Sequence, residues 1–475
     1  MPFDFSLLII ILFLLFTLLV AFFSTKSPKT FREHAVGKKQ FSLTTLTITL
    51  LASIYGGGTL KGGITIWFSD GFFWIVWQFF LSSISLLITG WLAGRMHKFM
   101  YHCSMPESIG RVYGKYPRLI ATLISVCYII AFTGLQINCL SKAISMCIDS
   151  NNYLLTILAT MMICIYAILG GIYAITFTDI WQYITFFSII VALVWVMSRK
   201  IDNLGLEIIP FLETHKQAAC SLHNIFFPFN NKLQPILYYL AVLAYMDPCD
   251  IQIVYMASSP MQARKVFLWA SLFAMVITVC LLLIGLFIFI KVPTLPTREV
   301  FDYMVANVPS YFKGLICICL LAMIMSTVDS KLHTGAIIMS REILEHMNHI
   351  KISNNQHILL NYLTMATLAI LAMLCALYKN PFDYFRLVPI VAIYASIVVA
   401  PFILAVLGLR SNGQTALMGM ATGLFTLFAW DKWMSPIVGP TTGTFVSIVA
   451  NGLAILAAHY LYYCNKRGKK ARYLH

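Results

Sequence analysis

Charged residues are scarce in this sequence of 475 residues: Asp, Glu, Lys and Arg make up 11% of it, against about 25% in ordinary soluble proteins. Hydrophobic residues make up 60%. A soluble globule of this composition would expose a large apolar surface, and a disordered chain would not contain 34 Phe, 23 Tyr and 9 Trp. Both classes are excluded, and we expect an all-α polytopic membrane protein with little chain outside the bilayer.

Patterned metal ligands and catalytic groups are also missing. The 12 Cys residues are scattered, mostly within apolar runs, and show neither a zinc spacing nor a disulfide framework. The His residues are dispersed, and no nucleophile–base pair stands out. The net charge of +15 would favour nucleic acid in a soluble protein, but membrane proteins collect Lys and Arg in cytoplasmic loops. We therefore expect neither an enzyme nor a nucleic-acid-binding protein.

Apolar runs long enough to cross a bilayer recur along the whole chain. The first is preceded by no Lys or Arg, so we interpret it as a retained helix rather than a signal peptide. Basic residues follow it, which predicts an N-terminus outside the cell and, for an odd number of spans, a cytoplasmic C-terminus. The expected location is the plasma (cytoplasmic) membrane. About thirteen spans are predicted, at residues 5–23, 42–66, 71–94, 119–147, 153–169, 172–197, 234–258, 265–290, 312–340, 356–378, 384–408, 415–430 and 437–463.

Two of these runs contain residues that interrupt helices. The second run holds five glycines and Lys61 within residues 56–63, and the seventh holds Pro248 between Asp247 and Asp250. With the first run counted as an extra helix, both breaks fall at the start of a five-helix half. Breaks at equivalent positions of an inverted repeat are typical of transporter binding sites. Glycines at close helix contacts are an alternative for the first break, but they do not predict the second.

The ninth run carries hydroxyl and carboxylate groups on one helix face. Ser326, Asp329 and Ser330 are spaced i, i+3 and i+4, and Thr327 adds a second hydroxyl beside Ser326. Oxygen ligands of this kind suit a hard cation such as Na⁺. The alternative is that the hydroxyls bond back to carbonyls of their own helix, which leaves the cost of a membrane-embedded carboxylate unexplained.

A short segment between the fifth and sixth runs carries a family pattern. Residues 170–182, Gly-Gly-Ile-Tyr-Ala-Ile-Thr-Phe-Thr-Asp-Ile-Trp-Gln, resemble the signature of the sodium/solute symporter family, which includes sodium/proline-type and sodium/sugar-type symporters. The glycine-rich break, the Met325-Ser326-Thr327 triplet and Gln252 with residues 263–265 are also similar to that family. The resemblance extends over roughly residues 1–410.

The resemblance implies a five-plus-five inverted-repeat transporter core, preceded by one helix and followed by two. Residues 1–41 would form the extra N-terminal helix and a cytoplasmic loop, and residues 42–200 the first five-helix repeat. Residues 201–410 would form the second repeat with extracellular loops. Residues 411–475 would form two C-terminal helices and a short basic cytoplasmic tail.

The resemblance also implies a sodium site between the second and ninth runs. Its ligands would be three backbone carbonyls and two hydroxyls, from Ala52, Tyr55, Met323, Ser326 and Thr327. Asp179 would lie on the cytoplasmic exit path of sodium. In some members the matching Asp joins a second sodium site with serines of the ninth run, which here are Ser326, Asp329 and Ser330. Asp329 stands in this set where those members have a serine.

Substrate is expected beside the sodium, between the broken helices and the third run. Matching by position gives Thr59, Trp77, Gln78, Met246 and Cys249 as candidates, to which we add Lys61 and Asp247. Met246 and Cys249 are poor sugar ligands. Three roles stay open for Lys61: an ion pair with Asp247, a contact with a substrate carboxylate, or extension to the membrane surface.

The expected function is secondary active transport by alternating access. Sodium would act as the coupling ion for a small polar solute, with an amino acid or organic acid slightly favoured because of Lys61. The expected partners are the solute, sodium and the lipid bilayer, without an obligate protein partner. Two alternatives remain: a proton-coupled symporter, in which Asp179 and Asp329 carry protons, and a membrane sensor with a transporter fold, which the short tail disfavours.

Overall fold

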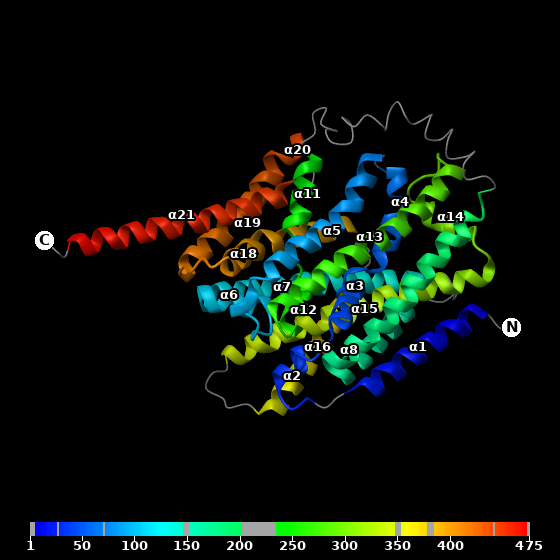
Figure 1. Cartoon of the computed structure of the whole chain (residues 1–475), viewed down its shortest axis with the longest axis horizontal. Helices are drawn as coiled ribbons and strands as arrows, with labels where there is room; N and C mark the ends of the chain where they lie inside the picture. The colour runs from blue at the N-terminus through cyan, green and yellow to red at the C-terminus, as the bar shows by residue number, and fades with distance from the viewer. Residues whose placement is uncertain are drawn as a thin grey trace.

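The computed structural model describes residues 5–25, 28–69, 72–145, 152–201, 234–346, 353–377, 384–439 and 442–472 (Figure 1). All of its regular elements in these ranges are helices. The longer ones are α1 (Phe5–Ser24), α3 (Leu43–Ile54), α4 (Gly57–Ser69), α5 (Phe72–Ala93), α7 (Lys115–Ser145), α8 (Asn152–Ser198), α11 (Gln234–Ala244), α13 (Pro260–Lys291), α15 (Ser310–His346), α16 (Asn354–Leu377), α17 (Tyr384–Tyr394), α19 (Gly413–Trp433) and α21 (Gly443–Arg472). The shorter ones are α2 (Phe31–Val36), η1 (Met96–Lys98), α6 (Met105–Tyr113), α12 (Pro248–Met256), α14 (Val300–Ala306), η2 (Ala395–Val399), α18 (Ala400–Val406) and α20 (Ser435–Val438).

The predicted membrane fold is confirmed. Each of the predicted apolar runs overlaps a helix or a broken helix. Within the described ranges, 7 helices are long and apolar enough to cross a bilayer, or up to 8 when the bent pair α3–α4 is counted as one span. The last predicted run began too early, because α20 ends at Val438, the next residue Gly439 has a φ of 120°, and the spanning helix α21 begins only at Gly443.

The fifth and sixth predicted spans are joined at a single residue. α8 runs from Asn152 to Ser198, and its only non-helical residue is Gly171, with φ 54° and ψ −158°. This left-handed conformation favours glycine. A Cβ at this position would also lie 2.8 Å from Nδ1 of His34 in α2. The second glycine of the predicted signature therefore forms the sharp turn between two spans and admits α2 against it.

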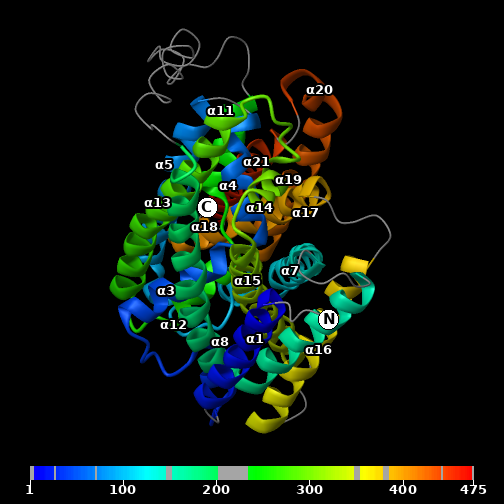
Figure 2. The ribbon, with the colours of Figure 1, turned by 90° about the vertical axis from the view of Figure 1, so that its right-hand side faces the viewer.

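α2 is a short helix buried under the bundle. Thr30 caps its N-terminus by accepting a hydrogen bond from the Glu33 amide at 3.1 Å. The carbonyl of Ala35 accepts a hydrogen bond from Nε2 of Gln252 in α12 at 3.1 Å. The helix thus connects the segment after α1 to the second half of the chain. α1 itself packs along α8 at the edge of the bundle (Figures 1 and 2), where the rings of Phe16 and Trp181 are 4.5 Å apart.

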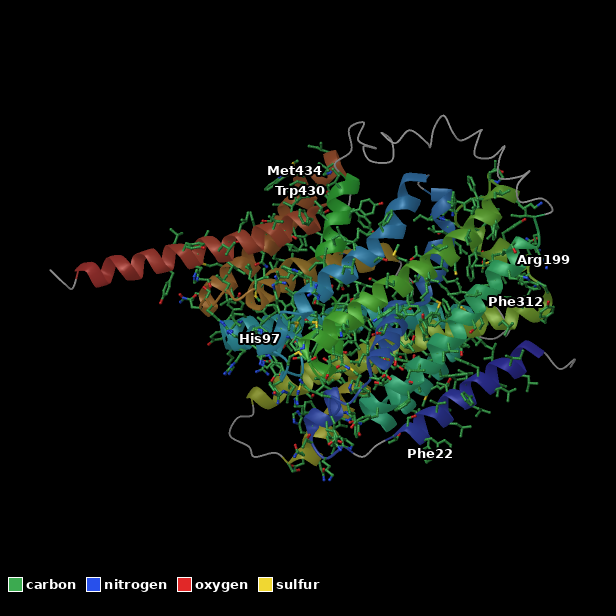
Figure 3. The ribbon with its side chains drawn as sticks, in the orientation of Figure 1. Phe22, His97, Arg199, Phe312, Trp430 and Met434 are labelled. Atoms are coloured by element: carbon green, nitrogen blue, oxygen red, sulfur yellow. The ribbon has the colours of Figure 1, made fainter. Side chains whose placement is uncertain are left out.

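An ion pair lies near one end of the bundle. His97, between α5 and α6, lies at one end, and Arg199 and Phe312 lie at the other (Figure 3). Near His97, Glu107 in α6 pairs with Arg341 at 2.5 Å. Burial opposes ionisation of Glu107, but the Arg341 guanidinium and the hydrogen bond from the Cys103 amide hold the pKa of this carboxyl below its ordinary value.

Candidate functional site

The first helix break lies between α3 and α4, which meet at an angle of 68°. α3 ends at Ile54, and the Gly57 amide donates to Oε1 of Gln136 in α7 at 3.1 Å instead of to an α3 carbonyl. A Cβ on Gly57 would lie 2.5 Å from Cγ1 of Ile324 in α15. The glycines therefore have two effects here: they allow the chain to leave the helix, and they bring it against α15.

Oxygen atoms from α3 and α15 converge at this break. Oγ of Ser326 donates to the carbonyl of Ala52 at 2.9 Å and lies 3.1 Å from the carbonyl of Met323. Oγ1 of Thr327 lies 2.9 Å from the same Met323 carbonyl. Four of the five oxygens predicted to bind sodium are thus brought together. Tyr55, the fifth residue, follows α3 immediately, and its hydroxyl points away to donate to the carbonyl of Ala274 in α13 at 3.1 Å.

Two buried carboxylates, one in α8 and one in α15, interact electrostatically near this cluster. Asp179 in α8 and Asp329 in α15 are both 0% exposed, and each acts electrostatically on the other. Neither carboxylate oxygen of Asp179 has a hydrogen-bond partner in the described parts of the chain. The same holds for the side-chain amide of Gln182, which lies one turn further along α8 and is also fully buried. Unpartnered buried oxygens of this kind are a place where a cation or a proton would be bound.

Ser330 belongs to the same helix turn but faces α3. Its Oγ accepts a hydrogen bond from Oγ of Ser53 at 2.9 Å, and its amide donates to Oδ1 of Asp329 at 2.6 Å. The predicted set of Ser326, Asp329 and Ser330 therefore differs in its contacts: the two serines contact α3, whereas Asp329 interacts electrostatically with Asp179 of α8. Gln182 and Ser53 were not among the site residues predicted from the sequence, although Gln182 is the last residue of the signature segment.

The second helix break lies between α11 and α12. α11 ends at Ala244, and α12 begins at Pro248, whose missing N–H suits the first position of a helix. Asp247 caps α12, because its Oδ1 accepts a hydrogen bond from the Cys249 amide at 2.8 Å. The Met246 carbonyl, which the break frees from helical bonding, accepts a hydrogen bond from the Tyr394 hydroxyl at 2.8 Å.

Asp247 forms a buried ion pair with Lys331 of α15. Its Oδ2 is in direct contact with the Lys331 ammonium and accepts a second hydrogen bond from the Tyr128 hydroxyl of α7 at 2.5 Å. The predicted alternative of an ion pair with Lys61 is wrong, since this carboxylate is already occupied by Lys331, which is 4% exposed. Sequence reasoning missed the pair because 84 residues separate its members and the helix register was unknown.

The other substrate candidates are only partly described. Lys61 is exposed on α4, and Thr59 is half-buried, its amide bonded to the Gly56 carbonyl at 2.9 Å. Met246 and Cys249 are buried at the second break, where Sγ of Cys249 lies 3.8 Å from the Ser330 carbonyl. The side chains of Trp77 and Gln78 lie outside the described part of the structure.

Comparison with known proteins identifies the family. The chain matches the model of the Sodium:solute symporter family over residues 35–423. Among solved structures, a Na⁺-coupled sialic acid symporter in a substrate-bound outward-open state has 16% identity and a TM-score of 0.81, covering 96% of both chains. A transporter of the nucleobase-cation-symport-1 family, in a closed conformation with bromovinylhydantoin bound, has 12% identity and a TM-score of 0.58, covering 93% of this chain and 96% of that one.

A more distant structural match is a manganese transporter from Eremococcus coleocola, with 12% identity and a TM-score of 0.52, covering 87% of this chain and 94% of that one. No curated protein matches the sequence. Identities this low establish a shared inverted-repeat transporter fold and nothing about substrates. The family model covers most of the chain, however, and agrees with the signature at residues 170–182. This chain therefore belongs to the sodium:solute symporter family and is a sodium-coupled solute symporter of the membrane, not an enzyme.

Proposed function

We propose that this symporter carries a small solute with a carboxylate group, an amino acid or an organic acid. The observation that carries the proposal is the exposed Lys61 on a polar face of α4. Gly58 and Gly62 flank it on the same face, and a Cβ at either glycine would meet nothing within 4 Å among the described residues. An ammonium group beside open space on a broken helix is placed to meet a solute anion.

A second lysine strengthens the positive field at this position. Lys61 of α4 and Lys142 of α7 both lie close enough to Cys139 to act electrostatically on its thiol, and both lysine side chains are exposed. Two ammonium groups near one thiol raise the local concentration of anions and disfavour cations. Asp247 does not neutralise this field, because it is engaged by Lys331.

Sodium would bind at the first helix break. Its proposed ligands are the carbonyls of Ala52, Tyr55 and Met323 and the hydroxyls of Ser326 and Thr327. Hydroxyl groups that now donate to carbonyls would rotate and turn their lone pairs to the ion, so that the ion holds α3 to α15. Such an ion links the two helices directly, which gives sodium a means of favouring one arrangement of the transporter over another.

Asp179 is proposed to assist the departure of sodium or to form a second ion site. The unpartnered carboxylate of Asp179 and its electrostatic interaction with the buried Asp329 support this role, with Ser330 one residue further along α15. Proton coupling is a second candidate, which the same observation supports, because interacting buried carboxylates favour binding of a proton. Sodium-free uptake driven by a proton gradient would distinguish this candidate.

The proposed orientation places the His97 end of the bundle in the cytoplasm of a cell whose plasma membrane holds the protein. Basic side chains gather at that end. Arg32 donates to the Met100 carbonyl at 3.2 Å, Lys39 lies over the Tyr101 ring at 4.8 Å, and Arg118 pairs with Glu342 at 2.9 Å. Positive charge of this kind is retained on the cytoplasmic side. The N-terminus would then be outside and the C-terminus inside.

The test is uptake into proteoliposomes under an inward sodium gradient, with labelled amino acids, organic acids, sugars and vitamins. We expect sodium-dependent accumulation of a carboxylate compound. For that compound, Lys61→Gln should raise KM at least tenfold, as about 1.5–3 kcal/mol for a hydrogen bond to a charged group implies. The control is Lys432→Gln, which removes an exposed lysine of α19. Uptake of neutral solutes alone, or a silent Lys61→Gln, would contradict the proposed substrate class.

A further inference from the structure

The second helix break contains a positively charged side chain of the protein itself, the ammonium group of Lys331. Lys331 lies one helical turn after Thr327 on α15, so the same helix serves both breaks. At the first break it contributes hydroxyl oxygens beside α3, and at the second it extends an ammonium group to Asp247, next to α12. The contacts of this ammonium group involve α7, α12 and α15, which are labelled in Figure 1.

The surroundings of the ammonium group are those of a cation site. Nζ contacts the Asp247 carboxylate and donates to the Tyr128 hydroxyl at 3.1 Å. It also lies 4.6 Å from the ring centroid of Phe132 and 5.0 Å from that of Tyr128, distances at which aromatic faces attract cations. The site is closed, since the Lys331 side chain is only 5% exposed.

The two oxygens of the Asp247 carboxylate have different hydrogen-bond partners. Oδ1 caps α12 through the Cys249 amide, while Oδ2 accepts from Lys331, Tyr128 and, at 3.4 Å, the Tyr245 hydroxyl. The cap fixes the position of the carboxylate at the break, and Lys331 and Tyr128 approach from helices outside the broken one. Removing Lys331 would leave this fixed, buried charge without its counter-ion, in a pocket shaped for an ammonium group.

We propose that Lys331 is a tethered cation, which occupies at the second break the kind of site that Na⁺ occupies at the first. It joins α15 to α12 as a bound sodium joins α15 to α3, but it does so in every cycle without binding or release. The latent site under it takes a monovalent cation, either a primary alkylammonium or an alkali ion. The rival role, in which Lys331 leaves Asp247 to bind solute, is an outcome of the test.

The first experiment replaces the tethered cation with a free one. Lys331→Ala should lower the unfolding temperature of the purified protein in detergent, and methylammonium should restore much of the loss. Tetramethylammonium should not, because it has no N–H to donate to Asp247 and Tyr128. In the double variant Lys331→Ala, Asp247→Asn methylammonium should have no effect. Equal stabilisation of wild type and Lys331→Ala by methylammonium, or no stabilisation of either, would overturn the proposal.

The second experiment counts sodium ions, which a merely structural lysine would not alter. Binding of ²²Na⁺ to purified protein should rise by one ion per chain in Lys331→Met and return to the wild-type number in Lys331→Met, Asp247→Asn. Lys331→Arg keeps the charge and should keep the wild-type number. The matched control is Asp250→Asn, because Asp250 acts on the same pair electrostatically but is not among the described hydrogen-bond partners of Lys331.

Each result of the sodium count has a defined meaning. An unchanged number in Lys331→Met, whether Asp247 takes up a proton or a solute group instead, would defeat the tethered-cation role. If Lys331→Met does not fold, the methylammonium experiment on Lys331→Ala tests the tethered-cation role instead. A wild-type protein that binds no sodium would contradict the proposed sodium ligands at the first break, while the methylammonium result would still stand for the second.

Discussion

The oxygen atoms at the two helix breaks are bonded by different kinds of side chain. At the first, glycines free the backbone, and the Ala52 and Met323 carbonyls accept hydrogen bonds from the hydroxyls of Ser326 and Thr327, which can rotate. At the second, the Met246 carbonyl is taken by Tyr394, and Asp247 is taken by Lys331. This difference supports our proposal that sodium binds at the first break, where the bonded hydroxyls can turn away, and not at the second, where Tyr394 and Lys331 hold the freed oxygens.

The largest expected effect is at the second break. Asp247→Ala should lower the free energy of unfolding by about 3–5 kcal/mol, because it leaves the Lys331 ammonium buried without a counter-ion. Chemical unfolding of the purified protein measures this loss. The double variant Asp247→Ala, Lys331→Ala should lose less than the sum of the two single variants, since the unpaired charge is gone. Additive losses would show that the two residues stabilise the fold independently, which would contradict a stabilising ion pair at the second break.

The next effect concerns the first break. Ser326→Ala with Thr327→Ala removes two of five proposed sodium ligands and should raise the sodium concentration for half-maximal transport by about tenfold or more, equivalent to at least 1.4 kcal/mol. The fold should persist, because both changes make a helix less polar. Thr89→Ala is the control: that hydroxyl is buried and bonds back to the Ser85 carbonyl of its own helix at 3.0 Å. If the double variant had the same sodium dependence as Thr89→Ala, the proposed sodium site at this break would be wrong.

Glycine substitutions at the first break test why the chain requires glycine there. Gly57→Ala should destabilise the protein by about 1–3 kcal/mol, because its Cβ would lie 2.5 Å from Ile324. Gly58→Ala is matched in sequence and chemistry, but a Cβ there meets nothing within 4 Å in the described structure. It should be neutral or slightly stabilising through better helix propensity. Thermal unfolding of both variants measures the difference, and equal effects would show that contact with α15 is not what requires glycine.

The smallest effect is expected beside the breaks. Asp179→Asn keeps the shape of the side chain but removes the charge that we propose assists departing sodium, so kcat should fall more than KM changes. Initial uptake rates over a range of sodium and solute concentrations separate the two constants. If Asp179→Asn transports at the normal rate across that range, Asp179 has only a structural role and does not assist the departure of sodium.

The sequence predicted the helices and both breaks well, because apolar runs, glycines and proline act locally. It also assigned Ala52, Met323, Ser326 and Thr327 to one cluster, since the family resemblance supplied their pairing across the fold. Lys331 could be seen as a charge within a span, but its partner could not be chosen between Asp247 and other carboxylates. That choice depends on how α15 is rotated against α12 and α7, which no local pattern records.

The polar character of α15 has a consequence for how the protein is assembled. An apolar stretch of 18 residues in its candidate span is 83% buried within the bundle, and the helix carries both Asp329 and Lys331. Placed alone in lipid, these two residues would cost about 5–7 kcal/mol on insertion scales. The described partners of Lys331 are Tyr128 in α7 and Asp247 at the start of α12, and both precede α15 in the chain. They are therefore synthesised before α15, so the pairing of this ammonium group does not have to wait for a later helix.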